Sequence, residues 1–181
     1  MRKIWLSVLF LLIFLLSCNL FSTQSYATEG DLSASPSSQT VNYELPYPGL
    51  LPDSPLYFLR IIRDRTVGFL ISDSLKKSEF NLLQADKRLN AAIYLVNKGN
   101  VSLAFTTVSK AENYFLEALD KMDEAKKQGR DIGGIQGNLK SALEKHEQEL
   151  GFLIEKVSAE FKPSFEKELK RVVSFEQRLS Q

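Results

Sequence analysis

The amino-acid sequence predicts an all-α protein, an elongated antiparallel bundle of about four or five helices. Leucine or valine recurs every seven residues along 75–96, alanine recurs every seven residues along 104–125, and glycines separate the helical stretches. A seven-residue repeat places one face of a helix against a neighbour, as in a coiled coil. Ahead of the helices, the composition predicts a signal segment at 1–27 and a flexible linker at 28–42, so the helical domain is expected at 43–181.

The first 27 residues have the pattern of a secretory signal. Two basic residues precede an uncharged apolar run, Ile4–Leu16, which has the length of a signal's hydrophobic region. Small residues at positions −3 and −1 favour cleavage after Ala27. Two alternatives stay open: lipidation at Cys18, which follows a loose lipobox, or retention of residues 4–21 as a short membrane anchor. We therefore expect an exported protein, extracytoplasmic or in the cell envelope, that contacts the membrane only through this segment.

The net charge gives no support for some classes of partner. The formal net charge is +1, and removing residues 1–27 takes away two basic and no acidic residues, which leaves 21 basic and 22 acidic. A near-neutral protein gives no electrostatic reason to expect nucleic acid or anionic lipid as a partner. Cys18 is the only cysteine, so no disulfide can form within the chain and the fold must depend on packing. Residues 28–42 are rich in Ser, Thr and Gly, as in a flexible spacer.

A proline-rich motif at residues 46–59, called the elbow below, precedes the helices. Each proline pushes the residue before it out of the α region, so the motif is expected to be extended or turning. Its apolar residues are too many to leave in water, and we expect them to pack on the protein's own core. The alternative is a docking segment that is displayed to a partner. The candidate docking residues are Pro48, Gly49, Leu50, Leu51, Pro52, Pro55, Leu56, Tyr57 and Leu59.

The elbow also carries a resemblance to a known family. The stretch PYPGLLPDSPLYFLRIIRDR at 46–65, followed by SDSLKKSEFNLLQADKRLNAA at 72–92, resembles exported bacterial and archaeal proteins with a PG-x-x-P-x-S/H-P-x-Y-x-L motif before a long Lys/Glu/Ala/Leu helical region. That family is catalogued as a domain of unknown function. The resemblance covers about residues 43–128 and implies export and a helical fold. It brings no catalytic residues with it.

The first helix is expected at about Ser54–Leu70, with Ser54 as N-cap and Pro55 as the first helical residue. Its arginines are predicted to form a solvated polar side, and the alternative is a basic helix on a membrane surface. Gly68 lowers the helix propensity near the end. The apolar face is expected to comprise Leu56, Leu59, Ile62, Thr66 and Phe69, widened by Phe58 and Ile61.

The next two helices are expected at about 73–98 and 101–128, as antiparallel neighbours joined by a very short loop. Gly99 is a natural C′ residue, and Asn100 is a natural N-cap for the following helix. Alanine at one position of every heptad lets a neighbouring helix approach closely. These alanines are Ala104, Ala111, Ala118 and Ala125, and they alternate with Val101, Val108, Phe115 and Met122.

A fourth helix is expected from about Asp131, as N-cap, to Phe161. Its apolar stripe includes His146, the only histidine, which we interpret as a seam or boundary residue. Pro163 is expected to end or kink this helix, and residues 164–180 to form a short final helix or a bent extension. The final stripe comprises Phe165, Leu169, Val172, Val173, Glu176 and Leu179.

The sequence predicts no enzyme, no cofactor and no metal. One histidine without cysteine partners does not make a zinc site, and no G-x-S-x-G nucleophile motif or calcium-loop pattern is present. We therefore expect a structural or interaction module of the cell envelope, whose partner is an unknown envelope protein or a second copy. The alternative is an extracytoplasmic helical-bundle sensor that binds a small apolar ligand between its helices.

Overall fold

The computed structural model describes residues 42–180, which form five helices and no strand. The helices are α2 (Tyr57–Leu70), α3 (Ser74–Asn97), α4 (Val101–Lys127), α5 (Gly133–Lys156) and α6 (Lys162–Leu179). The all-α prediction is confirmed. None of these helices is long and apolar enough to cross a membrane. The expected signal segment, cleavage after Ala27, lipidation at Cys18 and residues 28–41 of the expected linker lie outside the described residues.

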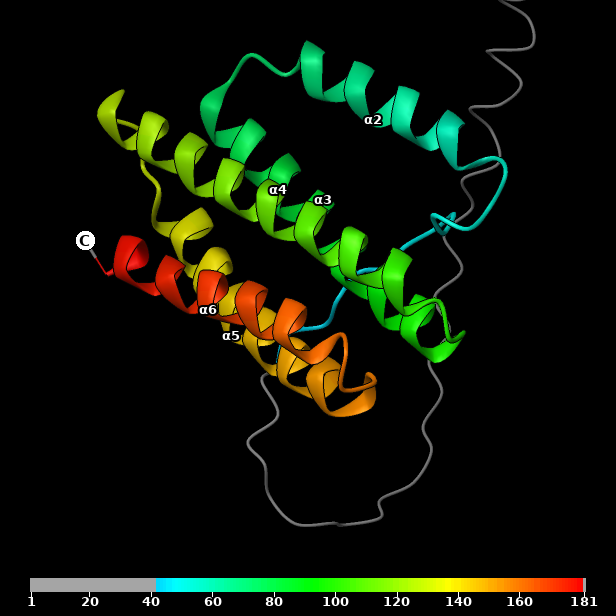
Figure 1. The fold of residues 1–181 in the computed structure, drawn as a ribbon. Coiled ribbons are helices and arrows are strands. Elements are labelled where there is room, and N and C mark those ends of the chain that lie inside the picture. The colour runs from blue at the N-terminus through cyan, green and yellow to red at the C-terminus, as the bar shows by residue number, and fades with distance from the viewer. Residues whose placement is uncertain (1–41, 181) are drawn as a thin grey trace, which may run out of the picture. The chain divides into compact units, whose positions relative to one another are not determined.

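Two helical hairpins, α3–α4 and α5–α6, pack together as a four-helix bundle (Figure 1). Neighbours around the bundle are α3 with α4, α4 with α6, α6 with α5, and α5 with α3, whereas α4 and α5 touch only sparingly. Aromatic pairs join α4 to α6: the ring centroids of Phe105 and Phe165 are 5.8 Å apart, and those of Phe115 and Phe175 are 5.6 Å apart. The bundle thus buries one core between two hairpins.

The heptad pattern predicted this core correctly. All four seam alanines of α4 are completely buried, together with Val108 and Phe115. On α3, Leu82, Ala85 and Leu89 are buried as expected. The Gly99 loop also matches its prediction, because Gly99 has φ +80° and so occupies the left-handed conformation of a C′ residue.

Some predicted helix ends and faces are wrong. Helix α2 begins at Tyr57, and Ser54 lies in the preceding turn, where its hydroxyl accepts a hydrogen bond from Leu56 N. Asn100 is the N-cap residue of α4 but makes no side-chain cap bond. Asp131 caps from one residue outside the N-cap position: its Oδ1 accepts from Gly133 N at 3.0 Å.

Pro163 begins α6 and does not kink a continuous helix. Helix α5 ends at Lys156, well before the predicted end at Phe161, and residues 157–161 turn the chain back. Pro163 then lies at the first turn of α6, where its missing N–H costs nothing. On α6, Val173 and Glu176 are exposed and Phe175 is buried in their place, so the predicted stripe is wrong at these positions.

Residues 43–53, which precede α2, run along α3 in the same direction. Tyr43 Oη donates to Asp86 Oδ2 at 2.7 Å, Asn90 Nδ2 donates to Pro46 O at 3.0 Å, and Lys98 pairs with Asp53 at 2.8 Å. Contacts therefore advance in step along both segments. Helix α2 then runs back in the opposite direction, as Figure 1 shows.

Candidate functional site

Helix α2 buries its polar side and exposes its apolar side. The inward stripe comprises Tyr57, Arg60, Ile61, Asp64 and Gly68, spaced as one face of a helix. Arg60 and Asp64 are each only 6% exposed. The prediction that Arg60 lies on a solvated face is therefore wrong. An apolar periodicity shows that a helix is two-sided, but here specific polar partners decide which side turns inward.

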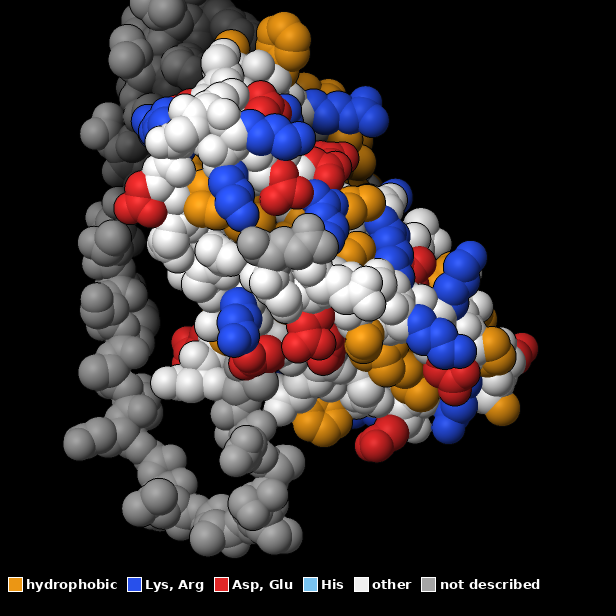
Figure 2. All heavy atoms as spheres, turned by 90° about the vertical axis from the view of Figure 1, so that its left-hand side faces the viewer, with side chains coloured by type: hydrophobic (Ala, Val, Ile, Leu, Met, Phe, Trp, Pro, Cys, Tyr) orange, Lys and Arg blue, Asp and Glu red, His pale blue; other side chains and the backbone are white. Residues whose placement is uncertain are grey.

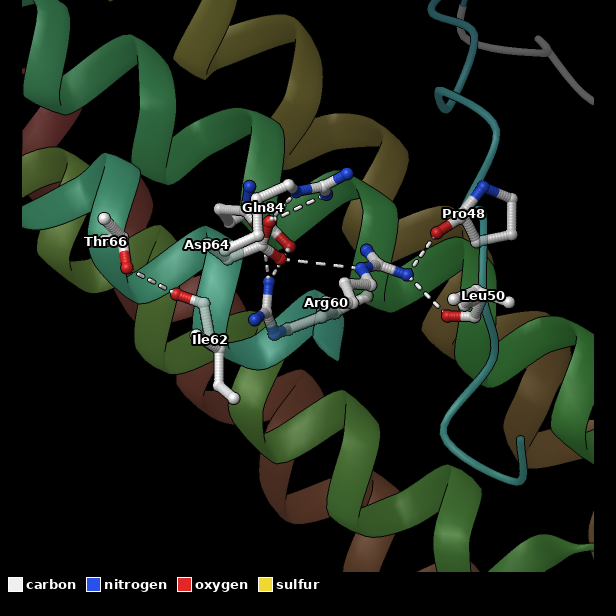
Figure 3. Close-up of polar contacts among 9 residues, drawn as sticks. Pro48, Leu50, Arg60, Ile62, Asp64, Thr66 and Gln84 are labelled. Carbon is white, nitrogen blue, oxygen red and sulfur yellow. Dashed lines mark hydrogen bonds and ion pairs between the residues drawn. The ribbon is translucent and has the colours of Figure 1, made fainter. Parts of the chain in front are cut away.

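Arg60 holds the elbow by its carbonyl groups (Figure 3). Its Nη1 donates to Pro48 O and, at 2.7 Å, to Leu50 O. Its Nε lies 3.5 Å from Asp64 Oδ2, and Arg63 Nη2 donates to Asp64 Oδ1 at 2.8 Å. Burial lowers the pKa of the Arg60 guanidinium, and the neighbouring Asp64 works in the opposite direction. One buried arginine thus ties two otherwise unpaired carbonyls of an extended segment to α2. We call this pair of hydrogen bonds the Arg60 clamp.

Gly68 brings the far end of α2 close to α3. A Cβ atom at this position would lie 3.2 Å from the Phe80 ring, and Lys77 Nζ donates to Gly68 O. Any larger residue would need the ring to move. At this end, α2 therefore contacts α3 through a glycine that lies against the Phe80 ring and through the Lys77 hydrogen bond.

The outward face of α2 is strongly apolar. Phe69 is 87% exposed, and the same face carries other large apolar side chains with Arg63 and Arg65 between and beside them. In Figure 2, where α2 lies at the top, hydrophobic side chains stand beside Lys and Arg at this surface. A concentration of exposed apolar side chains on one helix is typical of interaction surfaces. We call this surface, Phe58, Leu59, Ile62, Val67, Phe69 and Leu70, the α2 face.

The candidate docking residues do not share one environment. Pro48 is buried, and Leu51, Pro52 and Tyr57 are half-buried. Gly49, Pro55 and Leu56 are exposed, as are Leu50 at 44% and Leu59 at 51%. The expectation that Leu50 and Leu59 pack on the core is therefore wrong, because the elbow is held instead by hydrogen bonds from the Arg60 and Asn90 side chains to its backbone carbonyls. The alternative, display to a partner, stays a prediction.

A second polar cluster lies at the centre of the bundle. His146 of α5 is completely buried, with its Nδ1 3.0 Å from Glu112 Oε1 of α4 and its Nε2 3.1 Å from Asp86 Oδ1 of α3. Tyr43 donates to the other oxygen of Asp86, and the Phe115 ring packs against the imidazole with centroids 5.1 Å apart. Both imidazole nitrogens therefore face carboxylates, as an imidazolium that donates twice requires.

Charge in this cluster favours the protonated histidine. Burial alone lowers the pKa of His146, but Glu112 and Asp86 outweigh it and raise the pKa from 6.5 to about 9. Burial followed by the charge of Asp86 raises the pKa of Tyr43, so its phenol keeps its proton. The second Glu112 oxygen, Oε2, is buried and has no hydrogen-bond partner among the described residues. His146, Glu112 and Asp86 are buried, so the cluster joins three helices to one another and, through Tyr43, to the segment before α2.

Comparisons with known proteins connect this arrangement to a family. Residues 49–160, more than half of the chain, match the family model described as Domain of unknown function (DUF5667). The chain belongs to the DUF5667 family. No curated protein and no solved structure matches it.

The DUF5667 match includes most of both polar clusters. It begins at Gly49 in the elbow and ends before α6, so Arg60, Asp86, Glu112 and His146 lie within it. Tyr43 and α6 lie outside the matched residues. The DUF5667 segment thus contains Arg60 and the three charged groups of the core, whereas Pro48, whose carbonyl accepts from Arg60, lies just before it.

Sequence reasoning identified His146 as a seam residue but missed its partners. Asp86 and Glu112 each come directly after a seam alanine, Ala85 and Ala111, four residues after one large seam residue and three before the next. The signal in the sequence was that Asp86 and Glu112 occupy the same heptad position on two antiparallel helices. Among residues 42–180, no group of three or more His, Cys, Asp or Glu side chains is arranged to hold a metal ion.

Proposed function

We propose that this DUF5667 protein is an exported interaction module of the cell envelope, and that the α2 face is its contact surface. The carrying observation is the inverted orientation of α2: Arg60 and Asp64 are buried, whereas Phe69 is 87% exposed. A helix whose apolar side had no role would be expected to turn that side onto the core.

The attachment of α2 at two points also supports the proposal. The hydrogen bonds of Arg60 and the Gly68 contact hold α2 with its apolar side outward, which reduces the conformational freedom that binding would remove. A partner that covered these side chains would remove a large apolar area from water, which is the dominant favourable term in association.

The proposal is tested by retention of the protein in the envelope fraction of cells that produce the full chain. The double variant Phe58→Ser/Phe69→Ser removes two aromatic side chains from one side of α2. We expect its envelope-bound fraction to fall severalfold while its melting temperature stays unchanged, because both rings are exposed.

A matched control uses exposed apolar residues of other helices. Phe152→Ser/Val173→Ser alters α5 and α6 at side chains that are also exposed. This double variant should be retained like the unaltered protein. Equal retention of all three proteins, or a wholly cytoplasmic distribution, would refute the proposal.

The alternative of a sensor for a small apolar ligand has no supporting observation of its own. Pockets near Met122 and Ile132 and near Leu143 and Leu179 are open to solvent and contain charged side chains. Along α4, the seam positions are filled by alanines that are in contact with the neighbouring helices. The envelope module therefore remains the function that the geometry supports best.

A further inference from the structure

A pocket of about 350 Å³ lies between the elbow, α2 and α3. Residues 47–50 form one wall, Leu59, Arg60 and Arg63 of α2 form another, and Lys87 of α3 closes it. The volume is at the low end of the range for small-ligand sites. The pocket lies beside the α2 face, so a ligand bound there could also touch that face.

The charge of this pocket is not balanced. Three cations, Arg60, Arg63 and Lys87, line it, and Asp64 is the only carboxylate within residues 42–180 that forms an ion pair with any of them. Lys87 is half-buried and has no hydrogen-bond or ion-pair partner among residues 42–180. Burial lowers the pKa of Lys87, and the charges of Arg60 and Arg63 lower it further. A partly buried ammonium group held near two guanidinium groups indicates a place for an anion.

The apolar lining of the pocket indicates what the anion is attached to. Tyr47, Leu50 and Leu59 line the pocket and are exposed. Cations and exposed apolar side chains in one pocket match a molecule with one charged end and one apolar end. A phosphate ester carries about 1 to 2 negative charges at neutral pH, which matches the local excess of positive charge.

We propose that this pocket binds a phosphate group carried by an apolar molecule. Lys87 supplies the unpaired charge, Arg63 adds donors at the edge, and the elbow side chains contact the apolar part. The inference rests on the proposed function, since it names the chemistry of a ligand beside the same contact surface. The near-neutral net charge does not oppose it, because binding depends on the local cluster and not on the sum over the chain.

The test is calorimetric titration of the protein, as isolated from cells that produce the full chain, with inorganic phosphate, octyl phosphate and octyl glucoside. We expect octyl phosphate to bind more tightly than inorganic phosphate, and octyl glucoside not to compete. Lys87→Gln should weaken octyl phosphate binding by about tenfold or more, the factor expected for loss of a hydrogen bond to a charged group. Lys87→Arg should retain binding.

The matched control is Lys110→Gln, which removes the same charge from an exposed position on α4. Vesicles of phosphatidylcholine with or without phosphatidylglycerol show whether a lipid headgroup can be the source of the phosphate. Saturable binding of octyl phosphate alone, or of phosphatidylglycerol vesicles as well, supports the proposal if Lys87→Gln weakens it. Equal affinities of Lys87→Gln and Lys110→Gln, with unchanged melting temperatures, would overturn it.

The two proposals can fail separately. If Phe58→Ser/Phe69→Ser releases the protein from the envelope but Lys87→Gln has no effect on phosphate binding, only the phosphate site is wrong. If octyl phosphate binds through Lys87 but retention is independent of the α2 face, the proposed function is wrong and the pocket remains as a binding site.

Discussion

Helix α2 and the four-helix bundle turn their apolar side chains in opposite directions. In the bundle, the apolar stripes of α3–α6 face inward and enclose one charged cluster around His146. In α2, Arg60 and Asp64 face inward and the large apolar side chains face outward. In both regions, amphipathic periodicity predicts that a helix has an apolar and a polar face. It predicts which face is buried only where several helices share one core.

The backbone carbonyl groups of the elbow explain the difference. Its extended backbone cannot form helical hydrogen bonds, so the carbonyls of Pro48 and Leu50 need donors. Arg60 supplies them, and turning α2 over would leave these carbonyls without a partner inside the protein. No comparable demand exists between α3 and α4, where each helix satisfies its own backbone.

The largest difference between the two regions is expected when one large aromatic side chain is removed from each. Phe165→Ala in the core should lower the free energy of unfolding by about 3–5 kcal/mol, because it leaves a cavity. Phe69→Ala on α2 should change it by less than about 0.5 kcal/mol, because the ring is already in water. Urea denaturation measures both. Similar losses at both positions would mean that the α2 face is covered within the protein.

A comparable loss is expected when the central charge cluster is broken. Glu112→Ala removes one of the two carboxylates that hold the buried imidazolium and should destabilise the protein by about 3–5 kcal/mol. Glu117→Ala, at an exposed position of the same helix, is the control and should have an effect below about 0.5 kcal/mol. A neutral result for Glu112→Ala in urea denaturation would exclude a stabilising role for the cluster.

The pH dependence of stability tests the charge on His146 in this cluster. The pKa of His146 in the folded protein, about 9, lies above its ordinary value of 6.5, so its contribution is complete below pH 6.5 and is lost as pH rises through 9. The shift corresponds to about 3 kcal/mol, or a melting temperature lower by roughly 10 °C. His146→Gln should be less stable at pH 6 and should lose this dependence. Parallel thermal profiles of the two proteins between pH 6 and 10 would contradict the assignment.

A smaller effect is expected at the alanine seam. Ala111→Leu adds bulk at a completely buried position of α4 and should cost about 1–3 kcal/mol through overpacking. Lys110→Leu, one residue earlier and exposed, should change the free energy of unfolding by less than about 0.5 kcal/mol. Equal effects in chemical denaturation would show that the α4 seam has spare room.

The smallest global effect should come from the clamp. Arg60→Gln releases the elbow carbonyls, but α2 packs lightly on the other helices, so the global free energy of unfolding should fall by about 1 kcal/mol or less. Amide exchange in α2 should instead accelerate by about tenfold or more, because local opening becomes easier. The control is Arg65→Gln, at an exposed position of α2. Unchanged exchange in Arg60→Gln would mean that the clamp does not fix α2.

The helices, the Gly99 loop and the bundle seam could be predicted from the sequence alone. Heptad spacing and glycine placement are local signals, and a seam of alanines has only one stable environment, the contact with another helix. For the same reason, the burial of His146 could be predicted from its place in an apolar stripe.

The roles of the polar residues follow only from contacts in the tertiary structure. Asp86 and Glu112 lie 60 and 34 residues from His146 in the chain, and Arg60 meets carbonyls 12 and 10 residues before it. A charged side chain looks the same in the sequence whether water or a buried partner satisfies it. Its role depends on which groups the fold brings within hydrogen-bond distance, and that depends on packing between segments that have no local signal in common.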